Sequence, residues 1–186
     1  MKRFVLYLLF FYSCSNQPAV EQTRLMTVAS TDLSLKFEHG LCLYGAKKFS
    51  GSVTEKLSDG KVHQVINYIN GRQEGLQQLY FNDGMIAESR YFKDGEKDST
   101  HTGWWENGKL RFEYHFKKGL YHGDFKEWYE DGNPLKHIHY TNGNDDWGKG
   151  WRNNGKVYMN YIVKDGRRYG IINSNLCYSV ANETIK

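Results

Sequence analysis

The stretch Asp124-Phe-Lys-Glu-Trp-Tyr-Glu-Asp-Gly132, followed directly by Asn133-Pro-Leu-Lys-His-Ile-His-Tyr-Thr-Asn-Gly143, is the clearest copy of a pattern that recurs five times between Gly51 and Gly170. The glycine that ends each half belongs to a series along the chain. The first series steps by 24, 24, 24 and 23 residues through Gly60, Gly84, Gly108, Gly132 and Gly155. The second takes the same steps through Gly71, Gly95, Gly119, Gly143 and Gly166. Two series with one period and the same single deletion identify a repeat protein.

Each repeat carries two turn signals between short runs with strand character. Asp-Gly or Asn-Gly ends the first half of every repeat, at 59–60, 83–84, 107–108, 131–132 and 154–155. We interpret these pairs as two-residue hairpin turns with both central residues at positive φ. Asn70-Gly71, Asp94-Gly95, Asn142-Gly143 and Asp165-Gly166 supply the return turns. No stretch has the 3.6-residue period of a helix, so the sequence predicts an all-β, elongated antiparallel meander of about five β-hairpins.

The turn prediction implies a register. In a two-residue hairpin, the residue three before the glycine pairs with the residue two after it, which gives Leu57/Val62, Phe81/Ile86, Trp105/Leu110, Tyr129/Pro134 and Arg152/Val157. Nine of these ten residues are apolar or aromatic, as cross-strand pairs on a buried face should be. The second strands continue this face with residues such as Tyr114 and Ile138, and place His115, His139 and several lysines on a wet face. A further column, Gly51, Gly75, Gly123 and Gly170, opens the first strands and suggests a bulge or a close backbone approach.

The N-terminal segment has the features of an export signal. Lys2 and Arg3 precede an apolar run over 4–12, which is shorter than the ~20 apolar residues needed to span a bilayer. Ser13-Cys14 follows, so residues 1–14 resemble a bacterial lipoprotein signal in which Cys14 is lipidated. An ordinary cleaved signal is the alternative, and either places the mature chain outside the cytosol. We expect a flexible tether over 15–32, capping strands over 33–48, repeats over 49–170, and a C-terminal capping strand and tail over 171–186.

The charge pattern excludes a nucleic-acid partner of the usual kind. The net charge is +4 and charged residues make up 25% of the chain. Lysines and arginines are interleaved with acidic residues in every repeat, so no basic patch forms.

The most suggestive candidate site is a second aromatic column: Tyr80, Trp104, Trp128 and Trp151, each four residues before a turn glycine. It falls on the face opposite the apolar one, with members spaced ~9.5 Å apart. Its expected cross-strand partners are Ala87, Arg111, Leu135 and Tyr158, with Arg111 stacked on Trp104. Such a ladder suits sugar rings or an extended peptide. We favour a structural interpretation, in which the aromatic column covers the second side of a thin sheet, because the column follows the repeat pattern.

The remaining chemistry-bearing residues predict no catalytic or metal site. His115 and His139 hold equivalent positions ~9.5 Å apart, too far to share one small ion, and His137 adds only a weak chelate. Cys42 and Cys177 lie at opposite ends of the array, ~45–50 Å apart, and are predicted to be buried thiols rather than a disulfide. No nucleophile and base can be placed together. The sequence therefore predicts a protein without cofactor that is not an enzyme.

Three segments carry a family resemblance. Gly123-x-Phe-x-x-Trp-Tyr-x-x-Gly132-x-Pro-Leu…Tyr140-x-Asn-Gly143, Gly103-Trp-Trp-Glu-Asn-Gly-Lys-Leu110 and Leu79-Tyr-Phe-Asn-Asp-Gly84 resemble the MORN-repeat variant of bacteria. The resemblance covers about 49–170 and implies successive hairpins without common catalytic residues. The fifth repeat departs from it, with Gly148, Gly150 and Arg152 at bulky or apolar positions, so we expect a less regular sheet there.

The family resemblance also bears on function. Many such chains are exported lipoproteins, and many are described as antitoxin-like. The sequence thus predicts a lipid-anchored protein of the bacterial cell envelope that acts as a protein-interaction or scaffold module. The alternatives are a module that binds envelope glycans through the aromatic ladder, and an antitoxin-like partner of a toxin.

Overall fold

The structure is a computed structural model that describes residues 26–172. The predicted signal and its Cys14, as well as Cys177, lie outside these residues. Every element is a strand: β1 (Met26–Ala29), β2 (Leu35–Glu38), β3 (Leu41–Tyr44), β4 (Lys47–Lys48), β5 (Gly51–Lys56), β6 (Val62–Ile69), β7 (Arg72–Gln73), β8 (Gly75–Tyr80), β9 (Ile86–Lys93), β10 (Glu96–Lys97), β11 (Ser99–Trp104), β12 (Leu110–Lys117), β13 (Leu120–Trp128), β14 (Pro134–Thr141), β15 (Asn144–Trp151), β16 (Val157–Lys164) and β17 (Arg167–Ile171).

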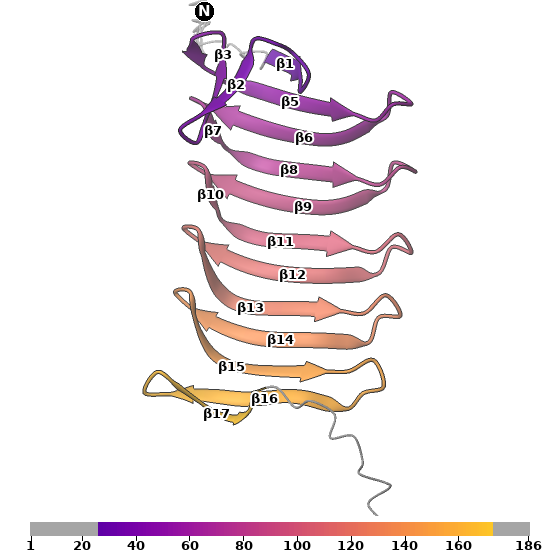
Figure 1. The fold of residues 1–186 in the computed structure, drawn as a ribbon, viewed down its shortest axis with the longest axis vertical. Helices are drawn as coiled ribbons and strands as arrows, with labels where there is room; N and C mark the ends of the chain where they lie inside the picture. Colours follow the sequence, from indigo (N-terminus) through magenta and orange to yellow (C-terminus); the bar gives the residue numbers. More distant parts are fainter. Residues whose placement is uncertain (1–25, 173–186) are drawn as a thin grey trace, which may run out of the picture.

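The strands form one long sheet of stacked hairpins, which confirms the predicted fold class. The order β1-β5-β6-β8-β9-β11-β12-β13-β14-β15-β16-β17 follows the chain after β5, and all pairs except β1–β5 are antiparallel. Figure 1 shows the hairpins β5–β6, β8–β9, β11–β12, β13–β14 and β15–β16 lying one below another. Neighbouring repeats therefore hold one another in place, as in other solenoid-like arrays. No helix long and apolar enough to cross a membrane occurs among residues 26–172.

The turns that close the hairpins differ from the prediction. The N–H of Gly60 donates to the carbonyl of Leu57, and the N–H of Leu57 donates to the carbonyl of Lys61. Only the glycine has positive φ, because Asp59 instead uses its carboxylate to accept the N–H of Lys61 at 3.0 Å. The same contacts recur at the other four turns. At these five positions the Asp/Asn-Gly pair therefore forms a longer turn with only the glycine in the left-handed region, and the two-residue turn predicted there is wrong.

This turn also shifts the register by one residue. Tyr80, Trp104, Trp128 and Trp151 pair with Ile86, Leu110, Pro134 and Val157, whereas the prediction gave these partners to the next residue along. In each case a β-bulge leaves one extra residue on the second strand, three positions after the turn glycine. The residues at this position are Ala87, Arg111, Leu135 and Tyr158.

The return turns follow the prediction, and two glycines of the opening column make the predicted close backbone approach: a Cβ would stand 2.1 Å from the Met26 carbonyl oxygen at Gly51 and 2.3 Å from that of Asn160 at Gly170. Asn70-Gly71, Asp94-Gly95, Asn142-Gly143 and Asp165-Gly166 have positive φ at both positions, the conformation expected of two-residue hairpin turns. In the opening column Gly51, Gly75, Gly123 and Gly170 also have positive φ, and Ser99, which replaces glycine in the third repeat, keeps a φ of 58°.

The N-terminal end is capped by a small sheet that packs on one face. β2, β3 and β4 form it, and Cys42, Phe49 and Tyr68 bury one another against Val28 and Val53. Cys42 is a buried free thiol, and burial raises its pKa. The boundary predicted for the tether is wrong, because β1 pairs with β5 and Val28 lies in this core.

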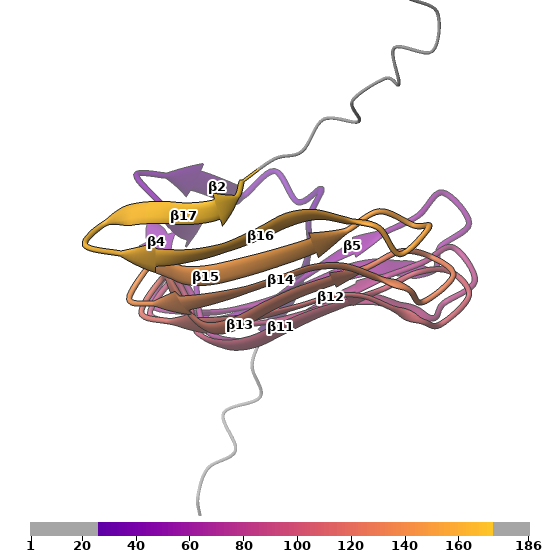
Figure 2. The same ribbon diagram turned by 90° about the horizontal axis from the view of Figure 1, so that it is seen from below.

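Figure 2 shows that the main sheet is bowed, with β2 and β4 on its concave side. Aromatic rings on this concave face contact one another in stacked, tilted and T-shaped pairs and form a continuous cluster from β9 to β14. We call it the concave aromatic cluster: Phe92, His101, Phe112, Tyr114, Phe116, Tyr121, Phe125 and Tyr140. Centroid separations run from 3.9 Å, for Tyr114 and Phe125, to 6.4 Å, for Tyr114 and Tyr121. Because the rings shield one another, a single layer of sheet has a core.

Glycines on the opposite strand give the rings room to lie against the sheet. A Cβ on Gly103 would stand 2.3 Å from the ring of Phe112, its cross-strand partner. In the fifth repeat, Gly148 and Gly150 make the same space for Tyr161 and Tyr158. The fifth hairpin therefore keeps the register of the others, and the less regular sheet expected there is not found.

The C-terminal edge strand is β17, which begins before the predicted boundary at 171. Arg168 on β17 donates two hydrogen bonds to the Asp145 carboxylate, at 2.8 and 3.1 Å, and lies over the Tyr161 ring. These bonds lower the pKa of Asp145, so it stays ionised and fastens the edge strand to β15.

Candidate binding surfaces

The convex face carries the predicted aromatic column at the ends of the first strands. Lys149 lies 5.3 Å over the Trp151 ring, and the Tyr80 hydroxyl donates to Gln78; both of these neighbours alternate with concave-face residues. The column is half-buried. Strand alternation therefore places it on the convex face, as the sequence analysis expected.

The corrected register changes what lies beside these rings. Their partners are all apolar, and Ile86, Leu110 and Val157 are 40%, 37% and 39% exposed. Aromatic and aliphatic side chains therefore alternate across the strands, with Val62 continuing the row into the first repeat. We call this row the convex apolar stripe: Val62, Tyr80, Ile86, Trp104, Leu110, Trp128, Pro134, Trp151 and Val157.

Arg111 does not belong to this surface. The bulge turns it to the concave face, where its guanidinium lies 5.7 Å from the Trp105 ring and 5.1 Å from the Phe112 ring. The predicted stacking of Arg111 on Trp104 is therefore wrong. The register shift that moved it was not visible in the sequence, because the bulge depends on the turn conformation.

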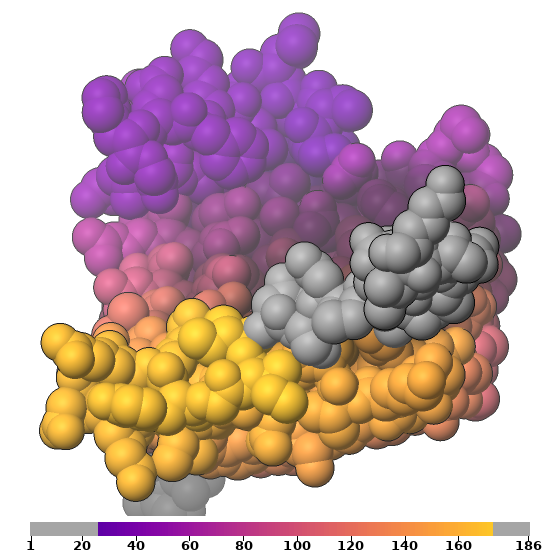
Figure 3. Space-filling model, turned by 60° about the horizontal axis from the view of Figure 1, so that its bottom comes forward, coloured from indigo at the N-terminus to yellow at the C-terminus, as the bar shows by residue number. Residues whose placement is uncertain are grey.

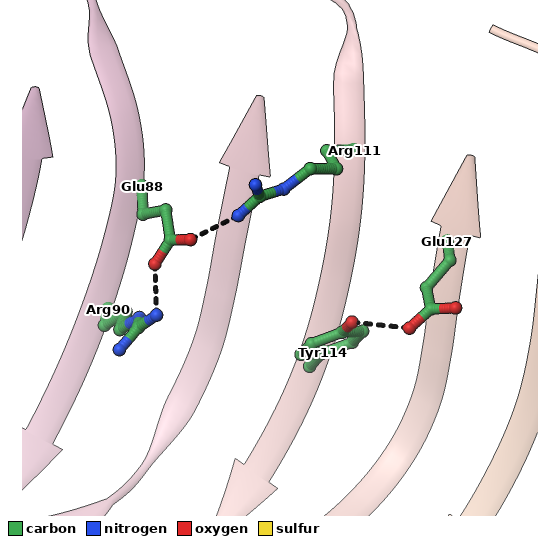
Figure 4. Close-up of polar contacts among 5 residues, drawn as sticks. All are labelled: Glu88, Arg90, Arg111, Tyr114 and Glu127. Atoms are coloured by element: carbon green, nitrogen blue, oxygen red, sulfur yellow. Dashed lines mark hydrogen bonds and ion pairs between the residues drawn. The ribbon is translucent and has the colours of Figure 1, made fainter. Parts of the chain in front are cut away.

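On the concave face, charged residues are set into the aromatic cluster. Glu88 on β9 is 7% exposed and accepts from Arg90 and Arg111, one carboxylate oxygen for each (Figure 4). Arg111 reaches Glu88 across β11, at the position where Gly103 has no side chain. This triad was not predicted from the sequence, since its members come from two repeats and the bulge brings them together.

A second group lies beside the first. The Tyr114 hydroxyl donates to Glu127 at 2.7 Å, and Lys136 pairs with the same carboxylate at 3.0 Å. Burial, followed by the neighbouring Glu127, raises the pKa of Tyr114 above its usual range, so this hydroxyl remains a donor. The two groups together make the concave face polar at its centre and aromatic around it.

The histidines of the convex face have protein partners. His137 Nε2 lies 3.1 Å from Asp124, and His139 Nδ1 lies 2.8 Å from Asp146. The Trp147 ring packs against both imidazoles. No group of three or more His, Cys, Asp or Glu that could hold a metal ion occurs between residues 26 and 172.

The two faces have different shapes. Figure 3 shows the concave face as a trough between the indigo N-terminal strands and the yellow C-terminal hairpin. In the trough, a hollow of about 460 Å³ is lined by residues including Arg90, Trp105, Arg111, Glu127 and Leu135. It adjoins a smaller hollow of about 180 Å³, and the two share Glu88 and Arg90.

Comparison with known families identifies three consecutive repeats. Residues 73–94, 97–118 and 121–142 each match the model of the MORN repeat variant. Each match spans one hairpin and ends at the first residue of its return turn, and the structure has the same hairpin in the repeats on either side. A comparison with curated proteins gave no match.

Proposed function

We propose, on the premise that residues 73–142 consist of MORN-variant repeats, that this chain is a non-enzymatic interaction or scaffold module. It binds a partner protein along the convex apolar stripe and is held at a bacterial membrane by a lipid on Cys14. The observation that supports the first part is the stripe itself. Exposed apolar side chains are common singly, but a continuous row of them across five repeats is typical of an interaction surface.

The composition of the stripe favours a protein over a glycan. Sugar rings stack on aromatic side chains while neighbouring polar groups bind their hydroxyls. Here the positions between the rings hold Ile86, Leu110, Pro134 and Val157, which offer no side-chain hydrogen bond. An apolar partner surface matches this row. The register predicted from the sequence placed Arg111 beside the rings, where it could have bound a sugar hydroxyl; the observed register removes that support for glycan binding.

Site-directed photo-crosslinking tests the surface. A photo-reactive residue at Leu110, inside the stripe, is expected to give a discrete crosslinked product in cells. The same residue at Glu113, on the same face and strand but outside the stripe, is expected to give none. With the photo-reactive residue kept at position 110, the double substitution Ile86→Asp/Val157→Asp should abolish that product, since it removes two apolar contacts of roughly 1.5–3 kcal/mol each.

Ile86 and Val157 are surface residues, 40% and 39% exposed, so the double variant should keep its melting temperature within a few degrees. Equal crosslinking from positions 110 and 113 would argue against the stripe. A change in tryptophan fluorescence with envelope glycans that Trp104→Ala/Trp128→Ala abolishes would instead support glycan binding.

The membrane anchor is a separate prediction. The wild-type protein is expected to partition into the detergent phase of a Triton X-114 extraction, because an acylated N-terminus buries several CH₂ groups at about 0.8 kcal/mol each. Cys14→Ser should move nearly all of it to the aqueous phase, whereas Cys42→Ser, at a thiol inside the fold, should leave partitioning unchanged. A Cys14→Ser variant that stays in the detergent phase would contradict lipidation at this residue.

The antitoxin-like alternative stays a prediction that nothing above tests. It requires a toxin partner in the cytosol, where an exported chain does not act. Rescue of cells from a neighbouring toxin by a form without residues 1–14 would support it over the anchored module.

A further inference from the structure

The concave trough contains a polar hollow that the proposed function leaves unused. It lies on the face opposite the convex apolar stripe, although Trp128, a member of that stripe, also contributes to its lining. Its centre is the triad of Glu88, Arg90 and Arg111, and its apolar end is formed by Trp105 and Leu135. At the other end the smaller hollow adds the amides of Gln64 and Gln77.

The two arginines are held in place before any ligand arrives. Glu88 binds one nitrogen of each guanidinium, and the rings of Trp105 and Phe112 pack against Arg111. Both arginine side chains nevertheless remain 38–39% exposed. Among residues 26–172, Glu88 is the only hydrogen-bond partner of either guanidinium, so the remaining N–H groups are available to a ligand. A guanidinium can donate two parallel hydrogen bonds to a carboxylate, so the two fixed arginines are preorganised to bind a carboxylate ligand.

The charged residues in and beside the hollow carry a net positive charge. The lining holds Arg90 and Arg111 with Glu88 and Glu127, and Lys136 pairs with Glu127 from outside the lining, so the five residues together carry one net positive charge. Glu127 is already matched by Lys136 and by the Tyr114 hydroxyl. An incoming carboxylate therefore meets an uncompensated cation at the arginine pair, with apolar surface on one side and amides on the other.

The shape of the hollow selects between a small acid and a chain. The two hollows join at Glu88 and Arg90 and together reach from Gln64 on β6 to Leu135 on β14, which crosses several strands. A single small acid would occupy only the central part. An extended peptide, by contrast, presents a side chain on the same side every second residue and could place apolar and polar groups at the two ends.

We propose that the concave hollow at Arg90, Arg111 and Trp105 is a binding site for an acidic side chain of an extended peptide segment from a partner protein. The carboxylate lies between the two guanidiniums, an apolar side chain of the peptide lies against Trp105 and Leu135, and backbone groups meet the amides of Gln64 and Gln77. Glu88 acts as the positioning residue for both arginines.

The test uses the full chain and a capped, extended synthetic peptide rich in valine and threonine with one central glutamate. Binding is followed by fluorescence anisotropy of the labelled peptide. Replacing the glutamate by glutamine should weaken binding about tenfold or more, since a charge-assisted hydrogen bond contributes roughly 1.5–3 kcal/mol. Arg111→Gln should cause a similar loss. Arg111→Lys, which keeps the charge next to Glu88 but removes the planar fork, should recover only part of it.

Lys164→Gln is the charge-matched control, because Lys164 is exposed at the end of β16, away from the hollow. It should leave binding unchanged, and melting curves should show all three variants folded. Equal affinity for the glutamate and glutamine peptides, or an equal loss from Lys164→Gln, would overturn the carboxylate site. If N-acetylglutamate amide bound as tightly as the peptide, the peptide assignment would be overturned in favour of a small acid.

Discussion

Replacing Tyr114, whose side chain is half-buried, by alanine is expected to lower the free energy of unfolding by about 3–5 kcal/mol, the usual range for truncating a large aromatic side chain in a packed cluster. Tyr114 lies at the middle of the concave aromatic cluster, stacked 3.9 Å from Phe125 and 4.5 Å from Phe112, with Tyr121 packed edge-on. A single layer of sheet has no second layer that could move in to fill the space. The loss is therefore felt on both β11–β12 and β13–β14.

Chemical denaturation followed by far-UV circular dichroism measures the effect, which corresponds to a fall in melting temperature of roughly 6–20 °C. Tyr114→Phe separates packing from hydrogen bonding, since it keeps the ring and removes only the bond to Glu127. It should cost about 1 kcal/mol. If the phenylalanine variant were as unstable as the alanine variant, the cluster would depend on the Tyr114–Glu127 bond rather than on ring packing.

The fold was predictable because it depends on local signals repeated five times. Glycine with Asp or Asn marks every turn, alternation marks every strand, and each hairpin contacts mainly its neighbours, so no long-range pairing had to be guessed. The convex position of Tyr80, Trp104, Trp128 and Trp151 followed from alternation alone. These parts of the prediction needed no knowledge of side-chain contacts.

The site was less predictable because it depends on a single residue of register. Asp-Gly forms a two-residue turn at Asp94-Gly95 and the longer turn at Asp59-Gly60, where the Asp59 carboxylate accepts the N–H of Lys61, so the pair alone does not decide the choice of turn. That choice creates the bulge, turns Arg111 to the concave face and gives Trp104 an apolar partner. An error of one residue in the predicted register therefore gave the wrong neighbours to the residues of both candidate surfaces, although the hairpins themselves were predicted correctly.

The boundary predicted for the N-terminal tether, residues 15–32, was wrong for a different reason. Met26–Ala29 lie in a polar, non-periodic stretch, and a strand of four residues shows little alternation. It is ordered by pairing with β5 and by the burial of Val28 against Phe49 and Val53, which are contacts between distant parts of the chain. Local pattern could not reveal them.

Replacing Gly103 by alanine is expected to destabilise the protein, although it adds only one methyl group. The added Cβ would stand 2.3 Å from Cε1 of Phe112, whereas non-bonded carbon atoms settle at roughly 3.5–4.0 Å. The ring cannot move away freely, because it stacks on Tyr114 and carries the Arg111 guanidinium. Overpacking of this kind costs about 1–3 kcal/mol, measured as the loss of unfolding free energy in a denaturant titration.

A double-mutant cycle with Phe112→Leu shows whether the ring is the cause. In the leucine background the clash is relieved, so Gly103→Ala should cost less than about 1 kcal/mol there, and the two substitutions should be coupled by 1 kcal/mol or more. Thr102→Ala, on the neighbouring convex position, provides the matched control and should have little effect. Strictly additive costs for Gly103→Ala and Phe112→Leu would mean that alanine disturbs the backbone of β11 itself. In that case glycine would be required by the sheet and not, as the geometry indicates, by the aromatic ring that lies over it.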